Sequence, residues 1–160
     1  MRSTVRFSDC ETYRYDLNRV WDAAKGSVLF VMLNPSTADE RRNDPTVERC
    51  ERRARSMGYG SLWVVNIFAY RATDPKDLRR AASPIGPLND DVLTKAAENA
   101  DCVIAAWGAH GDHHQRGHAV RDMLWARGVS LHHIGLTKMG HPRHPLYVGY
   151  GTKPQLWTAT

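Results

Sequence analysis

Four short apolar runs, separated by segments of helical character, constrain the fold of this 160-residue chain more than any other feature. The runs are rich in β-branched and aromatic residues and are bounded by Gly, Asn or Pro, which is typical of strands. They cover residues 27–33, 61–68, 102–107 and 129–136. The first two, SVLFVML and SLWVVNIF, are almost continuously apolar, as strands covered by helices on both faces are. The pattern predicts a mainly parallel sheet.

Helical segments are expected between these strands, at residues 46–57, 89–100 and 115–127. The alternation of strands and helices indicates a layered α/β domain. Ahead of the first strand, the segments VRF, YRY and 17–24 suggest a small hairpin, or a strand leading into a short helix. The last 20 residues are rich in Pro, Gly and aromatic residues, so we expect an irregular segment over the sheet edge.

The composition is that of one globular domain over residues 1–160. A hydrophobic content of 42% supports one core, and 24% charged residues with 9% aromatics exclude a coiled coil or a disordered chain. No run approaches the roughly 20 apolar residues of a membrane span, and the N-terminus lacks a secretory signal. We therefore expect a cytoplasmic protein, with no membrane partner, that is a monomer.

Two further features of the composition concern partners and cofactors. The net charge of +5 and the pI near 9.3 favour an anionic partner such as nucleic acid, although proteins that bind none often share this balance. The three cysteines, Cys10, Cys50 and Cys102, form no C-x-x-C pair. They predict neither a disulfide framework nor a zinc or iron–sulfur motif.

Polar motifs follow each of the four predicted strands. In an open parallel sheet, ligands bind outside the carboxyl ends of the strands, where the connecting loops meet. The motifs are NPSTAD (34–39), Asn66 with Tyr70 and Arg71, WGAHG (107–111) and TKMGHP (137–142). The sequence therefore predicts one pocket formed by four loops.

Two asparagines are candidate ligand-binding residues. Asn34 precedes Pro35 in a rigid turn, so its amide can point into the pocket and orient a water, although it cannot act as a general base. Asn66 lies in an apolar strand, where an unpaired amide costs about 1–3 kcal/mol, and it could read a nucleobase edge. A turn hydrogen bond for Asn34 and a structural hydrogen bond for Asn66 are the alternatives.

Eight histidines invite a metal hypothesis, but their spacing does not support one. His114 and His118 could share a helical face, yet the sequence has no H-E-x-x-H motif and no obvious third ligand, so we expect no metal. In the loop HPRHP, prolines restrict His141 and His144, and a neutral imidazole there could donate to a developing oxyanion. A packed surface loop is the alternative.

Charged residues follow the first two motifs. Asp39 and Asp44 are the carboxylates nearest the end of the first predicted strand, so either is a candidate general base. Helical spacing places several arginines on one face, suitable for phosphates, or else solvated and paired with nearby acidic residues. The arginines are Arg41, Arg42, Arg49, Arg52, Arg53 and Arg55, with Arg71, Arg79 and Arg80 after the second motif.

Segments from most of the chain resemble an uncharacterised family, domain of unknown function 1643. They are YRYDLNRVW, FVMLNPSTAD, NDPT, GYG, VVNIFAYRATDP, IAAWG and GHPRHPLY. This resemblance by itself implies no activity.

The order of motifs is also similar, more distantly, to that of the uracil-DNA glycosylase superfamily. MLNPS (32–36) resembles its water-positioning motif, VNIFAYR (65–71) its base-reading strand, CVIAAWG (102–108) its V-V-x-L-G strand end, and HPRHP (141–145) its late histidine loop. The resemblance implies a three-layer α/β/α domain with a four-stranded, mainly parallel sheet. The chain departs from the family where Gly is missing before Leu33 and after Pro35, and it lacks the cysteines of the iron–sulfur members.

This second resemblance implies a hydrolase of the N-glycosidic bond to a uracil-type or modified base, in DNA or a nucleotide, as in DNA repair. No metal or organic cofactor is implied. Asn34 and Asp39 would position the water, and His141, preferred to His144 for its spacing from the fourth strand, would stabilise the leaving base. Asn66 would read the base. The other expected contacts are Tyr70, Trp107 and His144 to the substrate, Arg71 and Arg143 to phosphates, and Leu146 or Tyr147 as a wedge in duplex DNA.

Two other functions remain open from the sequence. The same pocket could belong to a non-catalytic module that binds nucleic acid or a modified nucleotide, which fits the missing glycines. It could also belong to an enzyme that acts on a small nucleotide-like substrate, and the basic surface would then be incidental.

Overall fold

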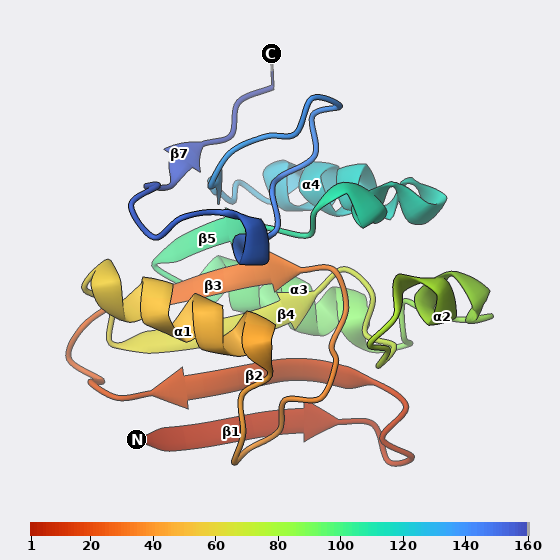
Figure 1. The fold of residues 1–160 in the computed structure, drawn as a ribbon, viewed down its shortest axis with the longest axis horizontal. Coiled ribbons are helices and arrows are strands. Elements are labelled where there is room, and N and C mark those ends of the chain that lie inside the picture. Colours follow the sequence, from red (N-terminus) through yellow and green to blue (C-terminus); the bar gives the residue numbers. More distant parts are fainter. Residues whose placement is uncertain (160) are drawn as a thin grey trace.

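The computed structural model describes residues 1–159 and contains one mixed sheet of seven strands, in the order β1-β2-β4-β3-β5-β6-β7 (Figure 1). The strands are β1 (Arg2–Phe7), β2 (Arg14–Val20), β3 (Ser27–Met32), β4 (Ser61–Asn66), β5 (Cys102–Ala105), β6 (Leu131–His133) and β7 (Gln155–Leu156). Neighbours among β3 to β6 pair in parallel, while β1, β2 and β7 add antiparallel pairs at the edges. The expected α/β class is confirmed, but the sheet is larger and more mixed than the four-stranded sheet predicted.

Within residues 1–159, four α-helices and two short 3₁₀ helices connect the strands. They are α1 (Pro45–Ser56), α2 (Pro75–Arg80), α3 (Asn89–Asn99), η1 (Ala109–Gln115), α4 (Arg116–Ala126) and η2 (Pro145–Tyr147). The three predicted helices are present as α1, α3 and α4, with ends within two residues of those expected. Asp44 caps α1 by accepting the N–H of Val47 at 2.8 Å, and Pro45 occupies the first turn, where a missing N–H costs nothing.

The short helix considered for residues 17–24 is wrong. Leu17 and Arg19 instead belong to β2 and pair with Val64 and Leu62 of β4. The neighbouring strands β1 and β4 satisfy the backbone hydrogen bonds of residues 17–20. Intrahelical hydrogen bonds are therefore not needed in this segment. The hairpin considered for the same region is formed by β1 and β2.

Helices cover both faces of the sheet, which explains the continuous apolar character of β3. Phe30 of β3 belongs to a cluster with Val47 of α1, whereas Leu29 belongs to a cluster with Leu93 of α3 and Leu124 of α4. Successive strand residues point to opposite faces, so both sets of β3 side chains are buried. Figure 1 shows α1 in front of β3 and β4, with α3 behind them.

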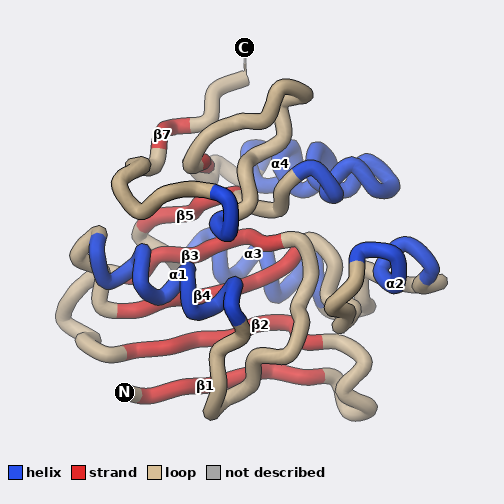
Figure 2. Tube along the Cα trace, viewed as in Figure 1, coloured by secondary structure: helices blue, strands red, loops and turns tan. Residues whose placement is uncertain are grey.

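The route of the chain opens a crevice at one end of the sheet. From β3 the chain passes through α1 on one face to reach β4, and from β5 it passes through α4 on the other face to reach β6. Adjacent strands β3 and β5 therefore send their connections in opposite directions, which leaves a crevice outside their carboxyl ends. Figure 2 shows the long loop that leaves β3 there before α1 begins.

The arginines of α1 are divided between structure and solvent. Arg53 is buried and donates to the backbone carbonyls of Val148, Gly149 and Thr152, which fastens the C-terminal segment onto α1. Arg52 instead forms an exposed i,i+4 ion pair with Glu48.

The irregular C-terminal segment expected from the sequence is present, although its two-residue strand β7 was not predicted. No helix within residues 1–159 is long and apolar enough to cross a membrane.

Candidate functional site

A cavity of about 540 Å³ lies at the crevice outside the carboxyl ends of the central strands. The loop after β3, the end of β4, the loop after β5, the loop after β6 and the first turn of α1 all contribute to its lining. The predicted site residues that line it are Asn34, Asp44, Asn66, Trp107, Arg143, His144, Leu146 and Tyr147. The pocket expected from four converging loops is therefore present.

Asn66 places a buried amide without partners in the lining of this cavity. Its side chain is 1% exposed, and within residues 1–159 neither Nδ2 nor Oδ1 has a hydrogen-bond partner. Its backbone carbonyl, by contrast, accepts from Nδ2 of Asn89 at 2.7 Å. A buried amide without partners costs about 1–3 kcal/mol, so the arrangement suits a ligand that offers both an acceptor and a donor.

Asn34 is held by contacts to the backbone of its own loop and of the loop that follows β4. Its Nδ2 donates to the carbonyl of Ala72 at 2.7 Å and to that of Pro35 at 3.1 Å. These two bonds fix the orientation of the amide and occupy its donor side. Oδ1 is then the part of the amide that is suited to accept a hydrogen bond from a water or ligand.

His144 lines the cavity in a defined tautomer. The backbone N–H of Leu146 donates to Nδ1 at 3.3 Å, so the ring proton is on Nε2. Burial lowers the pKa of His144 to about 4, with a smaller lowering by His110 that Asp44 opposes. The imidazole is therefore neutral at pH 7 and can donate from Nε2.

Gly108 sets the position of His144. Its φ of +75° is a conformation that other residues rarely adopt, and its N–H donates to the carbonyl of Pro142 at 2.8 Å. A Cβ added at Gly108 would lie 3.3 Å from Cβ of His144. Because Gly108 has no side chain, the loop after β5 can pack closely against the loop 141–145 that carries His144.

Comparison with known proteins connects this site to a family. The family model described as protein of unknown function (DUF1643) matches residues 14–146. The chain belongs to the DUF1643 family. No curated protein and no solved structure matches it. The matched segment includes Asn34, Asn66 and His144, so the cavity is part of the DUF1643 domain itself.

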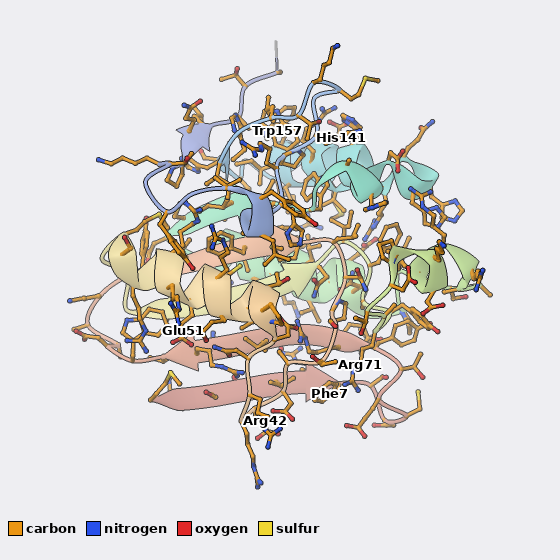
Figure 3. The ribbon with its side chains drawn as sticks, in the orientation of Figure 1. Phe7, Arg42, Glu51, Arg71, His141 and Trp157 are labelled. Carbon is orange, nitrogen blue, oxygen red and sulfur yellow. The ribbon has the colours of Figure 1, made fainter. Side chains whose placement is uncertain are left out.

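His141, the histidine preferred from the sequence, is not part of the cavity lining. Its ring lies 5.7 Å from that of His118 on α4, and its backbone N–H donates to Oγ1 of Thr137. Figure 3 shows its side chain near α4, in the upper part of the view. The DUF1643 cavity therefore receives His144 and not His141.

The two candidate carboxylates are placed differently. Asp39 is outside the lining, where its Oδ1 accepts the N–H groups of Arg41 and Arg42, and these bonds lower its pKa. Asp44 does line the cavity, but its two oxygens accept the N–H groups of Val47 and Ala38. The Asp-Pro pair at 44–45 is the helix-start signal that marks this residue in the sequence.

Neither of the two candidate stacking residues presents a free ring face to the cavity. Trp107 lines the cavity but is 1% exposed, because its ring packs where a Cβ on Gly111 or Gly117 would collide with it. Tyr70 is outside the lining and makes an edge contact with Tyr13, at 6.3 Å between ring centroids. Trp107 is thus a wall of the DUF1643 cavity, and Tyr70 belongs to the packing beside β2.

The two candidate phosphate-binding arginines also separate. Arg71 is outside the lining, where it donates to the carbonyl of Glu11 and lies 4.8 Å over the ring of Phe7 (Figure 3). Arg143 lines the cavity, is exposed and donates to the carbonyl of Tyr147 at 2.7 Å. Leu146 and Tyr147, 39% and 75% exposed, are at the cavity mouth.

Arg14 is a cavity residue that the sequence pattern does not predict. Its side chain is 1% exposed and lines the cavity. Nothing in the local pattern distinguishes it, because it begins a strand in a segment that resembles an ordinary hairpin.

Within residues 1–159, no group of three or more His, Cys, Asp or Glu side chains is placed to hold a metal ion.

Proposed function

We propose that this DUF1643 domain is a nucleobase N-glycosidic hydrolase that acts on a uracil-type or modified base in DNA or in a nucleotide. The observation that carries the proposal is the buried, unpartnered amide of Asn66 in the cavity. An amide presents a donor and an acceptor side by side, which is the pattern that a nucleobase edge complements. A base bound there would satisfy both groups.

The chemistry requires a water at C1′ and stabilisation of the departing base. The water oxygen attacks C1′ as the C1′–N bond breaks, the bond's electron pair leaves with the base, and the proton released by the water ends on the base or in solvent. The neutral His144 can donate from Nε2 to the negative charge that develops on the base. Oδ1 of Asn34 can accept from the attacking water and orient it. His144 thus takes the role first assigned to His141.

The uracil-DNA glycosylase-like architecture is part of the same proposal. Asn34, Asn66 and His144 come from three motifs that resemble that superfamily, and all three line one cavity. A shared binding site explains why three short motifs line one cavity more simply than chance does. The three-layer arrangement and the nucleic-acid partner follow from this resemblance.

Release of free base is the measurement that tests the proposal. The protein is incubated with single- and double-stranded oligonucleotides containing uracil, hydroxymethyluracil or hypoxanthine, and with the corresponding deoxynucleotides, and free base is measured by mass spectrometry. We expect release from at least one substrate, and its loss in Asn66→Ala. The matched control is Asn99→Ala, because that amide is exposed on α3 and bonds only to Lys95 of its own helix. Absence of release from every substrate contradicts the proposal.

A second candidate is a non-catalytic module that binds a modified base or nucleotide. One observation favours it, namely that both oxygens of Asp44 already accept backbone N–H groups and are poorly available as a general base. This candidate predicts oligonucleotide or nucleotide binding without release of base. Binding to an oligonucleotide should weaken steeply with salt, whereas binding of a neutral small ligand should not.

A further inference from the structure

Arg14 and Arg19, two arginines of strand β2, are equally buried but differ in their partners. Each is 1% exposed. The guanidinium of Arg19 donates through Nε and Nη2 to Oδ1 of Asn43, and through Nη2 to two backbone carbonyls, while its buried Nη1 has no partner within residues 1–159. Arg14 has one hydrogen bond, from Nη1 to the carbonyl of Ala38 at 3.0 Å, and its buried Nε has no partner within residues 1–159. Arg14 also differs in lining the cavity.

The charge of Arg14 is not matched by a contacting carboxylate. Among the ion pairs of residues 1–159 none includes Arg14. Asp44 and Asp16 act on it from a distance, and Arg19 and Arg71 oppose them. Burial lowers the pKa of Arg14 to about 10, which leaves it charged at pH 7. A buried charge without a contacting partner is costly, and an anion in the cavity would remove that cost.

The first turn of α1 is held beside Arg14. Arg14 donates to the backbone carbonyl of Ala38. The backbone N–H of Ala38 in turn donates to Oδ2 of Asp44, the cap of α1. Thr46, in the first turn of this 12-residue helix, also lines the cavity. The positive end of the helix dipole and a buried guanidinium therefore act on the same part of the cavity. The backbone N–H groups of Ala38 and Val47, which donate to Asp44, partly offset its negative charge.

We propose that this cavity binds a small nucleobase compound that carries a terminal oxyanion, a phosphate or a ring carboxylate, in contact with Arg14. The inference rests on the proposed function in taking the ligand to be a nucleobase compound. Because Arg14 is almost fully buried, the anionic group has to enter the cavity. A terminal phosphate or carboxylate can do so, whereas an internal phosphodiester has chain attached on both sides. The ligand class is thus a free nucleotide, which is a substrate of the proposed hydrolase, or an acidic base, which has no glycosidic bond and is bound as a product.

Matched neutral and charged ligands test the inference directly. Binding of uridine and uridine 5′-monophosphate, of inosine and inosine 5′-monophosphate, and of orotate is measured by isothermal titration calorimetry at low salt. We expect the wild type to bind at least one charged compound about 10- to 100-fold more tightly than its neutral counterpart. Preference for a monophosphate identifies a phosphate site, and preference for orotate over uridine identifies a carboxylate site.

Variants at Arg14 assign the preference to this residue. Arg14→Met should abolish it, and Arg14→Lys, which keeps the charge but loses the planar fork, should retain part of it. Arg19→Met is the matched control, because it removes a buried arginine of the same strand outside the cavity lining. Circular dichroism verifies folding, and if Arg14→Met fails to fold, a preference in Arg14→Lys equal to that of wild type overturns the inference.

Other outcomes separate this inference from the proposed function. Equal binding of neutral and charged compounds by wild type, a full preference in Arg14→Met, or no binding of any compound overturns the anion site. Asn66→Ala should weaken both members of a pair equally and leave their ratio unchanged. If the charge preference is found and no substrate releases base, the hydrolase proposal fails and the anion site stands.

Discussion

The backbone N–H of Leu146 donates to Nδ1 of His144 at 3.3 Å, and this contact decides which ring nitrogen can serve a ligand. With Nδ1 acting as an acceptor, the proton of the neutral imidazole is on Nε2. His144 caps the short helix η2 through this bond, so the structure that orients the ring is local to the histidine loop. The loop thereby supplies a neutral donor to the cavity.

Replacing His144 by Ala should reduce the rate of base release about 100-fold or more, because a donor to the developing negative charge is lost. The rate is measured under single-turnover conditions on the substrate that the release assay identifies. His141→Ala is the control, since this histidine lies in the same loop but outside the cavity lining. The control should retain a rate within about threefold of wild type. Equal losses in the two variants would contradict the role given to His144.

The pH dependence of base release should follow the protonation of His144. Its pKa is lowered to about 4, so the neutral imidazole persists through neutral pH, and the Nδ1 acceptor that orients it is lost to protonation only as the pH falls toward 4. We therefore expect no decrease in rate between pH 8 and pH 6 that depends on this histidine. An NMR titration of the imidazole measures the pKa directly. A titration midpoint near the ordinary value of about 6.5 would be inconsistent with this environment.

The same lowered pKa makes a prediction about stability. The unfolded chain binds a proton at this histidine near pH 6.5, whereas the folded protein resists protonation down to about pH 4. His144 therefore contributes its full stability above pH 6.5, and the contribution is lost as the pH falls from 6.5 through 4. Thermal unfolding from pH 7 to pH 4 should show a smaller decrease in Tm for His144→Gln than for wild type. An equal decrease in Tm for His144→Gln and wild type would contradict the lowered pKa assigned to His144.

The sequence predicted the central strands well because their signal is local. Strand β3 is buried on both faces, and its apolar run could be recognised without knowledge of its neighbours. The edge strands were harder, because β7 has only two residues and depends on its pairing with β6. Residues 17–20 were ambiguous for the same reason, since the partner strand β4 decides their conformation.

For the site, the sequence identified loops more reliably than side-chain directions. Asn34 and Asn66 follow or end buried strands, and strand ends are fixed by the sheet, so both reach the cavity. The choice between His141 and His144 depends on the turns of a proline-rich loop, which spacing from a strand does not determine. Arg14 could not be found, because its significance comes from burial beside α1, a helix far along the chain.

Substituting Ala for Gly108 should impair the site more than it impairs the fold. Its φ of +75° disfavours any side chain, and a new Cβ would press on Cβ of His144 at 3.3 Å. We expect a loss of about 1–3 kcal/mol in the free energy of unfolding, because the ψ of −175° at Gly108 is almost exclusive to glycine, and, in addition, a clear fall in base release. Urea denaturation and the release assay measure the two effects.

Gly128→Ala is the control for that substitution. Gly128 has a similar φ of +79°, and a Cβ there would meet no atom within 4 Å. Both substitutions place a side chain at positive φ, although the ψ of −175° at Gly108 adds strain of its own, and base release in Gly128→Ala should stay at the wild-type level. If Gly128→Ala reduces release as much as Gly108→Ala does, the close packing against His144 is not what sets the activity.

Arg53→Met should destabilise the fold, because the buried guanidinium holds the C-terminal segment through three backbone carbonyls. Hydrogen bonds from a charged donor are worth about 1.5–3 kcal/mol each, but the freed carbonyls can turn to water, so we expect a net loss of about 2–4 kcal/mol in urea denaturation. Arg52→Met, which removes only an exposed pair with Glu48, should cost less than about 0.5 kcal/mol. Amide hydrogen exchange should also rise across residues 148–157 in Arg53→Met alone. Unchanged exchange there would mean that the segment is held chiefly by β7 and by the packing of Trp157.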